Sequence, residues 1–421
     1  MSSVVTVVSL VVAGYLGILL LGDLYLIAVH LFIARAHIEK DRRALMTATL
    51  PADSALPKVC VQIPVHNEQL TVTEAIDAAC AQHWPKDRLE IQVLDDGSTD
   101  KTAEVAAAVI AARTQAPALR LYSRPERSEF KAGVLRFGLR RTTAEYVAVF
   151  DVDYRPTPDV LRQLMNVLLH DPNLAFVQAR LDYRNRNNNW LTRAQATELD
   201  MVMAFELATR SWNGLPLPFS GTCGIWRRAA IESAGGWLGR SLSEDLDLSF
   251  RALALGWRSR FLTSIPVPGE LPVSYRALWL QRSRWSTGIS QQFRYWPWAL
   301  HKQLPLHKFL AFFLLFQFHA FVRSGLLLMA GCLVFAWAAA AEQAWIIALA
   351  LISLISAVVV SRSIGALLAM RVLGRGIDLY ALTDLLLMWL LQLILLPVGA
   401  LSGLGGLFKK SAVFHRTPKG Q

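Results

Sequence analysis

Long apolar runs bracket a central region in which short apolar segments alternate with polar turns. The runs cover about residues 4–34, 309–340, 345–360 and 380–404. A helix needs roughly 20 residues to cross a hydrocarbon core about 30 Å thick, so each run is a candidate span. The pattern predicts a transmembrane helix within residues 1–34 and further transmembrane helices within residues 308–405. The first run is too long for a signal peptide, and no basic segment precedes it, so we expect a retained anchor.

Basic residues follow the first and the last apolar runs. They are Arg35, Lys40, Arg42, Arg43, Lys409, Lys410, Arg416 and Lys419. Basic flanks mark the cytoplasmic side of a membrane segment. We therefore expect both flanks to be cytoplasmic, with residues 406–421 as a basic cytoplasmic tail.

The number of membrane crossings is left open by the sequence. An anchor that enters the cytoplasm requires an even number of later crossings, but the pattern shows three later runs. Residues 361–377 could insert in part, although Arg362, Arg371 and Arg375 make them a poor span. Alternatively, the run around residues 319–324 could break into two short segments.

The central region, residues 50–275, has the pattern of an α/β domain. Short β-rich runs occur at Lys58–Pro64, Glu90–Leu94 and Glu145–Phe150, and helical spacing occurs at Thr71–Gln82 and Lys101–Thr114. Alternation of strands and helices favours an open, mostly parallel, Rossmann-like sheet covered on both faces. Ligands of such sheets bind beyond the carboxyl ends of the strands.

Carboxylates follow each of these three strands. They are Glu68, Asp95, Asp96, Asp151 and Asp153. Gathered carboxylates repel one another unless a cation or hydrogen-bond donors offset the cost. We expect a hard divalent cation held by Asp153 and Asp151 together with ligand phosphates. Taken alone, either acidic turn could equally be a solvated loop or a helix cap.

Two further segments have the composition of ligand-binding loops. Lys131-Ala132-Gly133 precedes a helical stretch, where a lysine and backbone amides suit a pyrophosphate, although a surface lysine is as good an explanation. Ser220, Gly221 and Thr222 lie in a small-residue loop whose glycine permits close approach of a ligand, or simply a tight turn.

The run from Ser243 to Arg251 predicts a helix with acidic residues in its first turn. Ser243 suits the N-cap, and Glu244 and Asp245 suit the positive end of the helix dipole. A charged helix cap would explain these residues fully. An ionised Asp245 at the edge of a ligand crevice would also meet the requirements of a general base. Asp247 is expected to face solvent or to pack structurally.

The segment Gln281-Arg282-Ser283-Arg284-Trp285 lies just before the C-terminal apolar runs. Residues 276–307 are expected to form amphipathic helices at the membrane interface, with Trp285 as an interfacial anchor. Gln281 and Arg284 could alternatively hold a diphosphate, because the guanidinium fork matches phosphate oxygens, while Trp285 stacks on a sugar.

Composition narrows the functional class. The formal net charge is +11, but basic residues cluster beside the apolar runs, which favours a membrane surface over nucleic acid as the partner. The four cysteines, Cys60, Cys80, Cys223 and Cys332, show no spacing of a metal site or disulfide framework. We expect them to be small buried residues in a reducing compartment.

As a set, these segments resemble the processive, membrane-embedded family 2 glycosyltransferases of the cellulose-synthase-like type. The shared motifs, in chain order, are Pro64-x-x-Asn67-Glu68, Asp95-Asp96-Gly97, Lys131-Ala132-Gly133, Asp151-x-Asp153, Glu244-Asp245 and Gln281-x-x-Arg284-Trp285. Further segments (177–180, 221–227 and 267–272) look most like mannan and glucomannan synthases and their bacterial relatives. Arg282 stands where a glutamine is common.

The resemblance implies a GT-A fold, inverting transfer from a nucleotide sugar, and a Mg²⁺ or Mn²⁺ cofactor. It implies donor-binding roles for Asn67, Glu68, Asp95, Asp96, Lys131, Asp151, Gln281 and Arg284. It implies catalytic roles for Asp245, as the base, and its neighbour Glu244. Acceptor binding is expected at Trp285, Ser220, Gly221 and Thr222, and metal binding at Asp151 and Asp153.

The resemblance also implies the reaction and its setting. We expect transfer of a hexose, from UDP-glucose or GDP-mannose, to a growing β-linked glycan at the lipid bilayer. The catalytic domain would face the cytoplasm at a bacterial inner membrane, and the product could pass through the membrane segments. Two alternatives stay open: a single-transfer enzyme that makes a glycolipid, and an inactive membrane scaffold or transporter.

Overall fold

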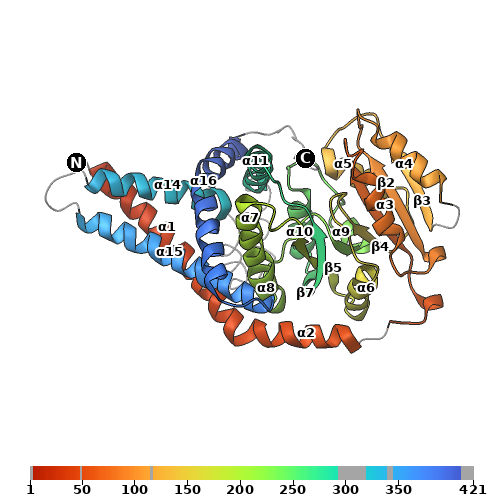
Figure 1. The fold of residues 1–421 in the computed structure, drawn as a ribbon, viewed down its shortest axis with the longest axis horizontal. Coiled ribbons are helices and arrows are strands. Elements are labelled where there is room, and N and C mark those ends of the chain that lie inside the picture. The colour runs from red at the N-terminus through yellow and green to blue at the C-terminus, as the bar shows by residue number, and fades with distance from the viewer. Residues whose placement is uncertain (1–2, 48–49, 114–116, 293–318, 339–344, 409–421) are drawn as a thin grey trace. The chain divides into compact units, whose positions relative to one another are not determined.

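The computed structural model describes residues 3–47, 50–113, 117–292, 319–338 and 345–408 (Figure 1). The chain divides into two compact units. An α/β unit contains residues 36–186 and 216–271, and a helical unit contains residues 1–35, 187–215 and the chain from Pro272. Residues 187–215 therefore interrupt the α/β region in sequence and pack with the helical unit.

The α/β unit is built on one sheet of seven strands in the order β3-β2-β1-β4-β6-β5-β7. The bounds of the strands are β1 Val59–Val65, β2 Leu89–Asp95, β3 Ala118–Ser123, β4 Tyr146–Val149, β5 Leu174–Tyr183, β6 Gly224–Arg227 and β7 Arg258–Gly269. Every pairing is parallel except those of β6, which runs antiparallel to β4 and β5. The predicted mostly parallel α/β fold is confirmed.

The burial of the central strands on both faces explains why the sequence predicts their positions well. In β1 and β2 nearly every residue is buried, including Gln62 and Gln92, whose amides hydrogen-bond at 3.0 Å (Nε2 to Oε1). Strands buried on both faces read as continuous apolar runs. Helices pack on this sheet, namely α3 Val72–Cys80, α4 Thr102–Ala111, α5 Phe130–Leu139, α6 Val160–His170 and α9 Arg228–Ser233, and α10 Glu244–Ala254 packs against α9.

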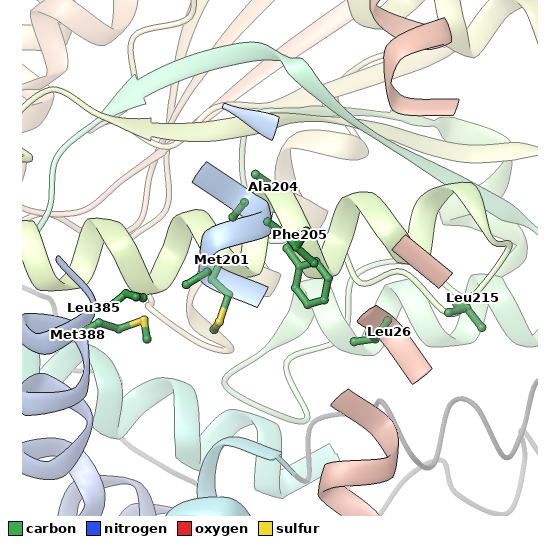
Figure 2. Packing of buried hydrophobic residues seen from close by; sticks show 10 residues of the cluster. Leu26, Met201, Ala204, Phe205, Leu215, Leu385 and Met388 are labelled. Carbon is green, nitrogen blue, oxygen red and sulfur yellow. The ribbon is translucent and has the colours of Figure 1, made fainter. Parts of the chain in front are cut away.

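The helical unit collects segments from three parts of the chain. Its elements are α1 Ser3–Val29, η1 His30–Ala34, α7 Trp190–Asp200, η4 Met201–Leu207, α8 Ala208–Trp212, α11 Tyr275–Gln291, α14 His319–Ala338, α15 Trp345–Val372 and α16 Leu379–Phe408. Figure 2 shows Met201, Phe205, Leu26, Leu385 and Met388 in one apolar cluster of this unit, which also includes Ala366 and Ala369 of α15. This cluster joins η4 to α1, α15 and α16.

Among the described residues, three helices are long and apolar enough to cross a membrane: Val4–Lys40, Ile346–Val372 and Leu379–Phe408. Residues 361–372 belong to α15, so they do not form a separate short span. Residues 319–324 open α14, and the chain before them (293–318) and residues 409–421 of the predicted basic tail lie outside the described residues. The helix α2 Arg35–Thr47 follows η1.

The expectation that all four cysteines are buried is wrong for two of them. Cys60 and Cys223 are buried, but Cys80 is half-buried and Cys332 is exposed on α14. Free cysteine behaves as a small hydrophobic residue, so Cys332 matches the apolar composition of the helix surface on which it lies.

Candidate active site

The strands that precede the acidic turns are neighbours in the sheet. β1 lies between β2 and β4, and both pairings are parallel, with Val65 opposite Asp95. The carboxyl ends of the three strands therefore meet at one edge, as the sequence predicts. Two polar clusters form there, one around the loop after β2 and one around Lys131.

Asn67 organises the loop after β2. Its backbone is left-handed (φ 57°), and its backbone N–H donates to Ser98 Oγ at 2.9 Å. Its side-chain oxygen accepts hydrogen bonds from the backbone N–H groups of Thr99 (2.8 Å) and Asp100 (3.3 Å). The Asn67 side chain thus fixes the loop that carries Asp95 and Asp96.

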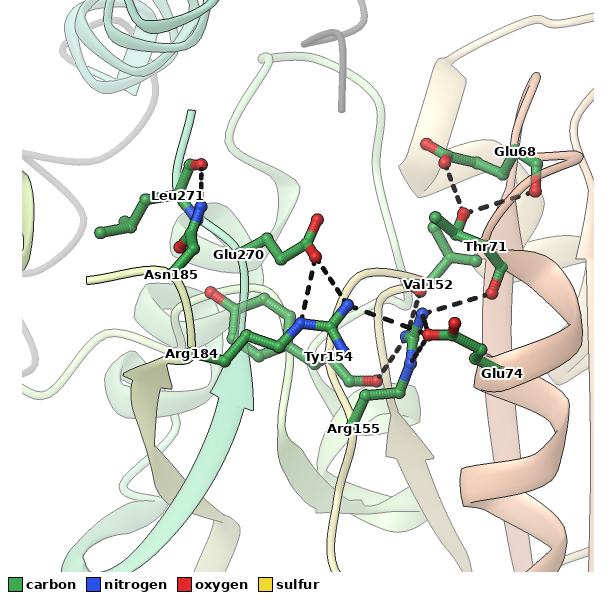
Figure 3. Close-up of polar contacts among 10 residues, drawn as sticks. All are labelled: Glu68, Thr71, Glu74, Val152, Tyr154, Arg155, Arg184, Asn185, Glu270 and Leu271. Atoms are coloured by element: carbon green, nitrogen blue, oxygen red, sulfur yellow. Dashed lines mark hydrogen bonds and ion pairs between the residues drawn. The ribbon is translucent and has the colours of Figure 1, made fainter. Parts of the chain in front are cut away.

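Glu68 is buried against the start of α3. Its backbone N–H donates to Thr102 Oγ1 at 2.6 Å, and its Oε2 accepts from the Thr71 hydroxyl at 2.8 Å (Figure 3). The predicted donor contact of Glu68 stays a prediction. The contacts in the structure hold the turn between β1 and α3 against α4.

Asp95 and Asp96 differ in their partners. Asp95 Oδ1 accepts from the backbone N–H of Ser98 at 3.2 Å. Asp96 accepts from Arg124 Nε at 2.5 Å and forms an ion pair with Arg127 at 3.4 Å. Burial raises the pKa of Asp96, and the two arginines oppose that rise. Arg124 and Arg127 are site residues that the sequence analysis missed, although both lie just before the Lys131 motif.

Lys131 is the centre of the second cluster. It lies in the first turn of α5, and its Nζ donates to Asp151 Oδ1 at 2.5 Å and to Gly221 O at 3.0 Å. The backbone N–H of Asp151 donates to Thr222 Oγ1 at 2.8 Å. Three predicted segments, the Lys131 motif, the β4 turn and the small-residue loop, therefore come together. Burial lowers the pKa of Lys131, but Asp151, Glu244 and Asp245 outweigh it, so the pKa is raised.

Asp245 reaches the same cluster from the start of α10. A Cβ added at Gly221 (φ +81°) would lie 2.9 Å from Asp245 Oδ2 and 3.5 Å from Lys131 Nζ. Burial raises the pKa of Asp245 to about 6, against the opposing effect of Lys131. Burial and the Asp245 charge raise the pKa of Glu244 to about 7. A carboxyl with a pKa near neutrality is suited to general-base work.

The rest of α10 corrects two expectations. Ser243 occupies the N-cap position, but its side chain makes no capping hydrogen bond among the described residues. Asp247 does not face solvent: it is fully buried and accepts from Arg240 Nε (2.7 Å) and Arg251 Nε (2.9 Å). A carboxylate paired with two arginines satisfies its charge inside the protein, so the structural half of that prediction is right.

Asp151 and Asp153 suit a divalent cation that also binds phosphate. Asp153 is buried and Asp151 is half-buried in the turn after β4. No group of three or more histidine, cysteine or acidic side chains with metal-site geometry occurs in the described parts of the chain. Magnesium-type ions are bound by one or two carboxylates plus substrate phosphates, so this pair fits such an ion.

Arg155 holds the Asp151–Asp153 turn in place and was also missed from the sequence. Its Nη1 donates to Val152 O at 2.5 Å and to Tyr154 O at 3.1 Å, and its Nη2 bonds Glu74 of α3 at 2.9 Å (Figure 3). Arg184 extends this network by pairing with Glu270 at 2.7 Å. An arginine two residues after an Asp-x-Asp turn is the only local signal for this role.

The remaining predicted residues are Ser220, Gln281, Arg284 and Trp285. Ser220 donates its backbone N–H to Gln178 Oε1 at 2.8 Å, which anchors the small-residue loop to β5. Gln281, Arg284 and Trp285 are half-buried on α11, which belongs to the helical unit. Residues 276–291 are helical as predicted, and residues 293–307 lie outside the described residues.

Comparison with known proteins gives the family and the fold of the chain. The family described as "Glycosyl transferase family group 2" matches residues 146–373, which include β4, α10 and α11. A solved mannosyltransferase from Pyrobaculum calidifontis, in complex with GDP-Man and Mn²⁺, shares the fold with a TM-score of 0.61 at 21% identity. The match covers 92% of this chain and 99% of that one.

The curated relatives are plant enzymes. Glucomannan 4-beta-mannosyltransferase 2 of Arabidopsis thaliana is 43% identical over 57% of this chain and 46% of its own length. A probable glucomannan 4-beta-mannosyltransferase 2 of Oryza sativa subsp. japonica is 38% identical over 63% of this chain and 47% of its own length. The chain thus spans about half the length of the curated relatives it matches.

Proposed function

Because the chain belongs to glycosyl transferase family group 2, we propose that it transfers a hexose from a nucleotide diphosphate sugar to a growing β-linked glycan. The names of the plant relatives favour a mannosyl unit and therefore GDP-mannose as the donor, with UDP-glucose as the alternative. The acceptor is a mannan- or glucomannan-type chain, extended processively at the membrane.

One observation carries this proposal. Asp245 lies beside Gly221 and Lys131, in the same cluster as Asp151. This arrangement combines a carboxylate of raised pKa with a glycine that lets this carboxylate approach the loop closely and with a cation next to the metal-type carboxylate pair. A nucleotide sugar requires all three, because its phosphates are anionic and its acceptor hydroxyl must lose a proton.

The proposed reaction is a single displacement. Asp245 accepts the proton of the acceptor hydroxyl as that oxygen bonds to the anomeric carbon. The bond between the anomeric carbon and the phosphate oxygen breaks, and the electron pair leaves with the nucleoside diphosphate. Attack on the face opposite the leaving group inverts the configuration, so an α-linked donor gives a β-linkage. No glycosyl-enzyme intermediate is required.

The other residues of the cluster bind and orient the reactants. Asp151 and Asp153 would hold Mg²⁺ or Mn²⁺, which when bound offsets the negative charge of the diphosphate. Lys131 can shift from Asp151 toward a phosphate oxygen, since both are anionic acceptors. Gln281, Arg284 and Trp285, on α11, keep the donor- and acceptor-binding roles that the family resemblance implies.

The setting follows from the helical unit. Three helices among the described residues are long and apolar enough to span a bilayer, which supports a location at a membrane. The α/β unit would lie on the cytoplasmic side, where nucleotide sugars are made. The basic flanks of the first and last apolar runs support this orientation. Passage of the product through the membrane segments is part of the proposal.

A donor screen tests the proposed function. Membranes that contain the protein are incubated with labelled GDP-mannose or UDP-glucose and with Mg²⁺ or Mn²⁺, and products are separated by size and digested with a β-mannanase or a β-glucanase. We expect a β-linked polymer that disappears when a chelator is added. A one-sugar lipid product would replace the polymerase assignment with glycolipid synthesis. If none of the nucleotide sugars is turned over, the assignment of the protein as a glycosyltransferase is wrong.

A further inference from the structure

Arg282, on the α11 segment that carries Trp285, has contacts that indicate a different role from that of Arg284. Arg282 and Trp285 are three residues apart, so they share one face of the helix. The Arg282 guanidinium lies over the Trp285 ring, 4.8 Å from its centroid. A cation on the face of an indole is attracted by the ring and limits its orientation.

Glu198 of α7 holds the Arg282 guanidinium from the other side. Arg282 Nη2 donates to Glu198 Oε2 at 2.6 Å, and Nη1 donates to Oε1 at 3.2 Å. The side chains of the two residues are only 14% and 13% exposed. A bidentate pair of this kind fixes the plane of the guanidinium as well as its position. Its charge is therefore matched within the protein.

The two helices form a rigid support for this contact. Leu191 and Ala194 of α7 and Leu278 of α11 share an apolar core with Leu391 and Leu395 of α16. The helix starts are also tied together, because Asn189 Nδ2 donates to Val273 O at 3.0 Å and Gln195 Nε2 donates to Pro272 O at 2.9 Å. Glu198 thus presents its carboxylate from a fixed position relative to α11.

We propose that Glu198 and Arg282 are positioning residues that set the orientation of the Trp285 ring for stacking on the acceptor sugar. This inference rests on the proposed function, which gives Trp285 its acceptor. Under this proposal, Arg284 contacts the donor diphosphate and Arg282 does not. Trp285 itself is half-buried, so part of its ring stays accessible for a ligand while Arg282 covers another part.

A neighbouring ion pair provides a matched control. Asp200, two residues after Glu198, accepts from Arg375 Nη1 at 2.6 Å. Asp200 is buried and Glu198 is largely buried, and the partner of Asp200 follows α15 rather than lying on α11. Asp200→Asn should therefore lower stability in the same way as Glu198→Gln without disturbing Trp285.

The experiment measures acceptor binding and transfer separately in purified full-length protein. Binding of a fluorescent β-1,4-mannotetraose is followed by anisotropy, and initial rates are measured with donor and acceptor varied in turn. For Glu198→Gln we expect acceptor affinity to fall on the order of 10-fold, with the donor KM unchanged, because a misplaced binding group costs about this much or more. Asp200→Asn should leave acceptor affinity as in the wild type.

Two Arg282 variants complete the test. Glu198→Gln/Arg282→Gln removes both charges, so it should fold as the wild type does while binding the acceptor weakly. Arg282→Lys keeps the charge but not the flat fork of the guanidinium. It should melt at the temperature of the wild type and bind the acceptor more weakly than the wild type. Wild-type acceptor affinity in Glu198→Gln, or equal losses in Glu198→Gln and Asp200→Asn, would overturn the inference. Absence of transfer in the wild type, with acceptor binding that still depends on Glu198, would overturn the proposed function instead.

Discussion

The acidic residues of the α/β unit and those of the helical unit are balanced in different ways. Around Lys131, the three carboxylates of Asp151, Glu244 and Asp245 act on one lysine. In the helical unit, Glu198 pairs with Arg282, Asp200 with Arg375, and Glu206 with Arg362. Negative charge exceeds positive charge in the first group, whereas each carboxylate of the second group has an arginine partner.

The difference separates a ligand site from structural pairing. Burial, with a smaller contribution from the Asp151 charge, raises the pKa of Asp245 to about 6 although Lys131 opposes the rise. Buried carboxylates in excess of their cations require a further cation. Matched pairs hold helices together and require no ligand. Arg362, within the apolar helix α15, shows the second case, because it contacts both Glu206 and Asp23 and Ser361 also donates to Asp23 at 3.1 Å.

The largest expected effect comes from removing the base in the unbalanced cluster. Asp245→Asn keeps the size of the side chain but cannot accept the proton of the acceptor hydroxyl. Since general-base catalysis contributes roughly 10²–10⁴-fold, transfer should fall about 10³-fold. Donor binding, measured by calorimetry with the nucleoside diphosphate, should be kept. Transfer within 10-fold of the wild type would show that another group is the base.

A large loss of stability is expected when a matched pair is broken. Arg362→Gln removes the cation that contacts both Glu206 and Asp23, and breaking a buried pair in this way costs about 3–5 kcal/mol. The melting temperature in detergent and the yield of folded protein should fall sharply. The double variant Asp23→Asn/Arg362→Gln, which removes one charge of each sign and keeps the ion pair between Glu206 and Arg210, should recover most of the loss. Equal stability of the single variant and the wild type would contradict the structural role.

Local sequence patterns predicted the parts of the site that depend on a single element. The strand ends, the turn at Asp151 and the first turn of α10 follow from apolar runs and helix starts that span a few residues. The sheet then brings them together, because parallel neighbours share an edge. Lys131 and Gly221 were predicted separately, and their contact required the fold.

Pairings between distant elements were not predictable. Glu198 and Arg282 are 84 residues apart, and nothing in either segment indicates the other. Asp247 was expected either to face solvent or to pack structurally; the structure shows the second, but the sequence did not identify its partners Arg240 and Arg251. The placement of residues 187–215 in the helical unit was hidden for the same reason, since that segment has the composition of an ordinary α/β helix.

A smaller effect is expected from filling the space between Gly221 and the base. Gly221→Ala places a methyl group 2.9 Å from Asp245 Oδ2 in a left-handed backbone, so both the loop and the carboxylate must shift. A displacement of this kind costs about 10- to 100-fold in kcat/KM. Gly214→Ala, whose backbone is also left-handed but whose added Cβ meets nothing within 4 Å, provides the control for backbone strain. Similar rates for the two variants would mean that Asp245 does not depend on the gap.

The smallest effect is a pH dependence that acts on activity and stability in opposite directions. Asp245 must be ionised to act as a base, so kcat/KM should fall about 10-fold per pH unit below pH 6. Its pKa is raised in the folded state from 3.8, so between about pH 4 and pH 6 the folded protein binds more protons than the unfolded chain. Ionised Asp245 therefore destabilises the fold at pH 7, and this penalty disappears as the pH falls. Asp245→Asn should melt at a higher temperature than the wild type at pH 7.5, and the difference should narrow below pH 6 and close toward pH 4. A constant difference across this range would place the titration outside Asp245.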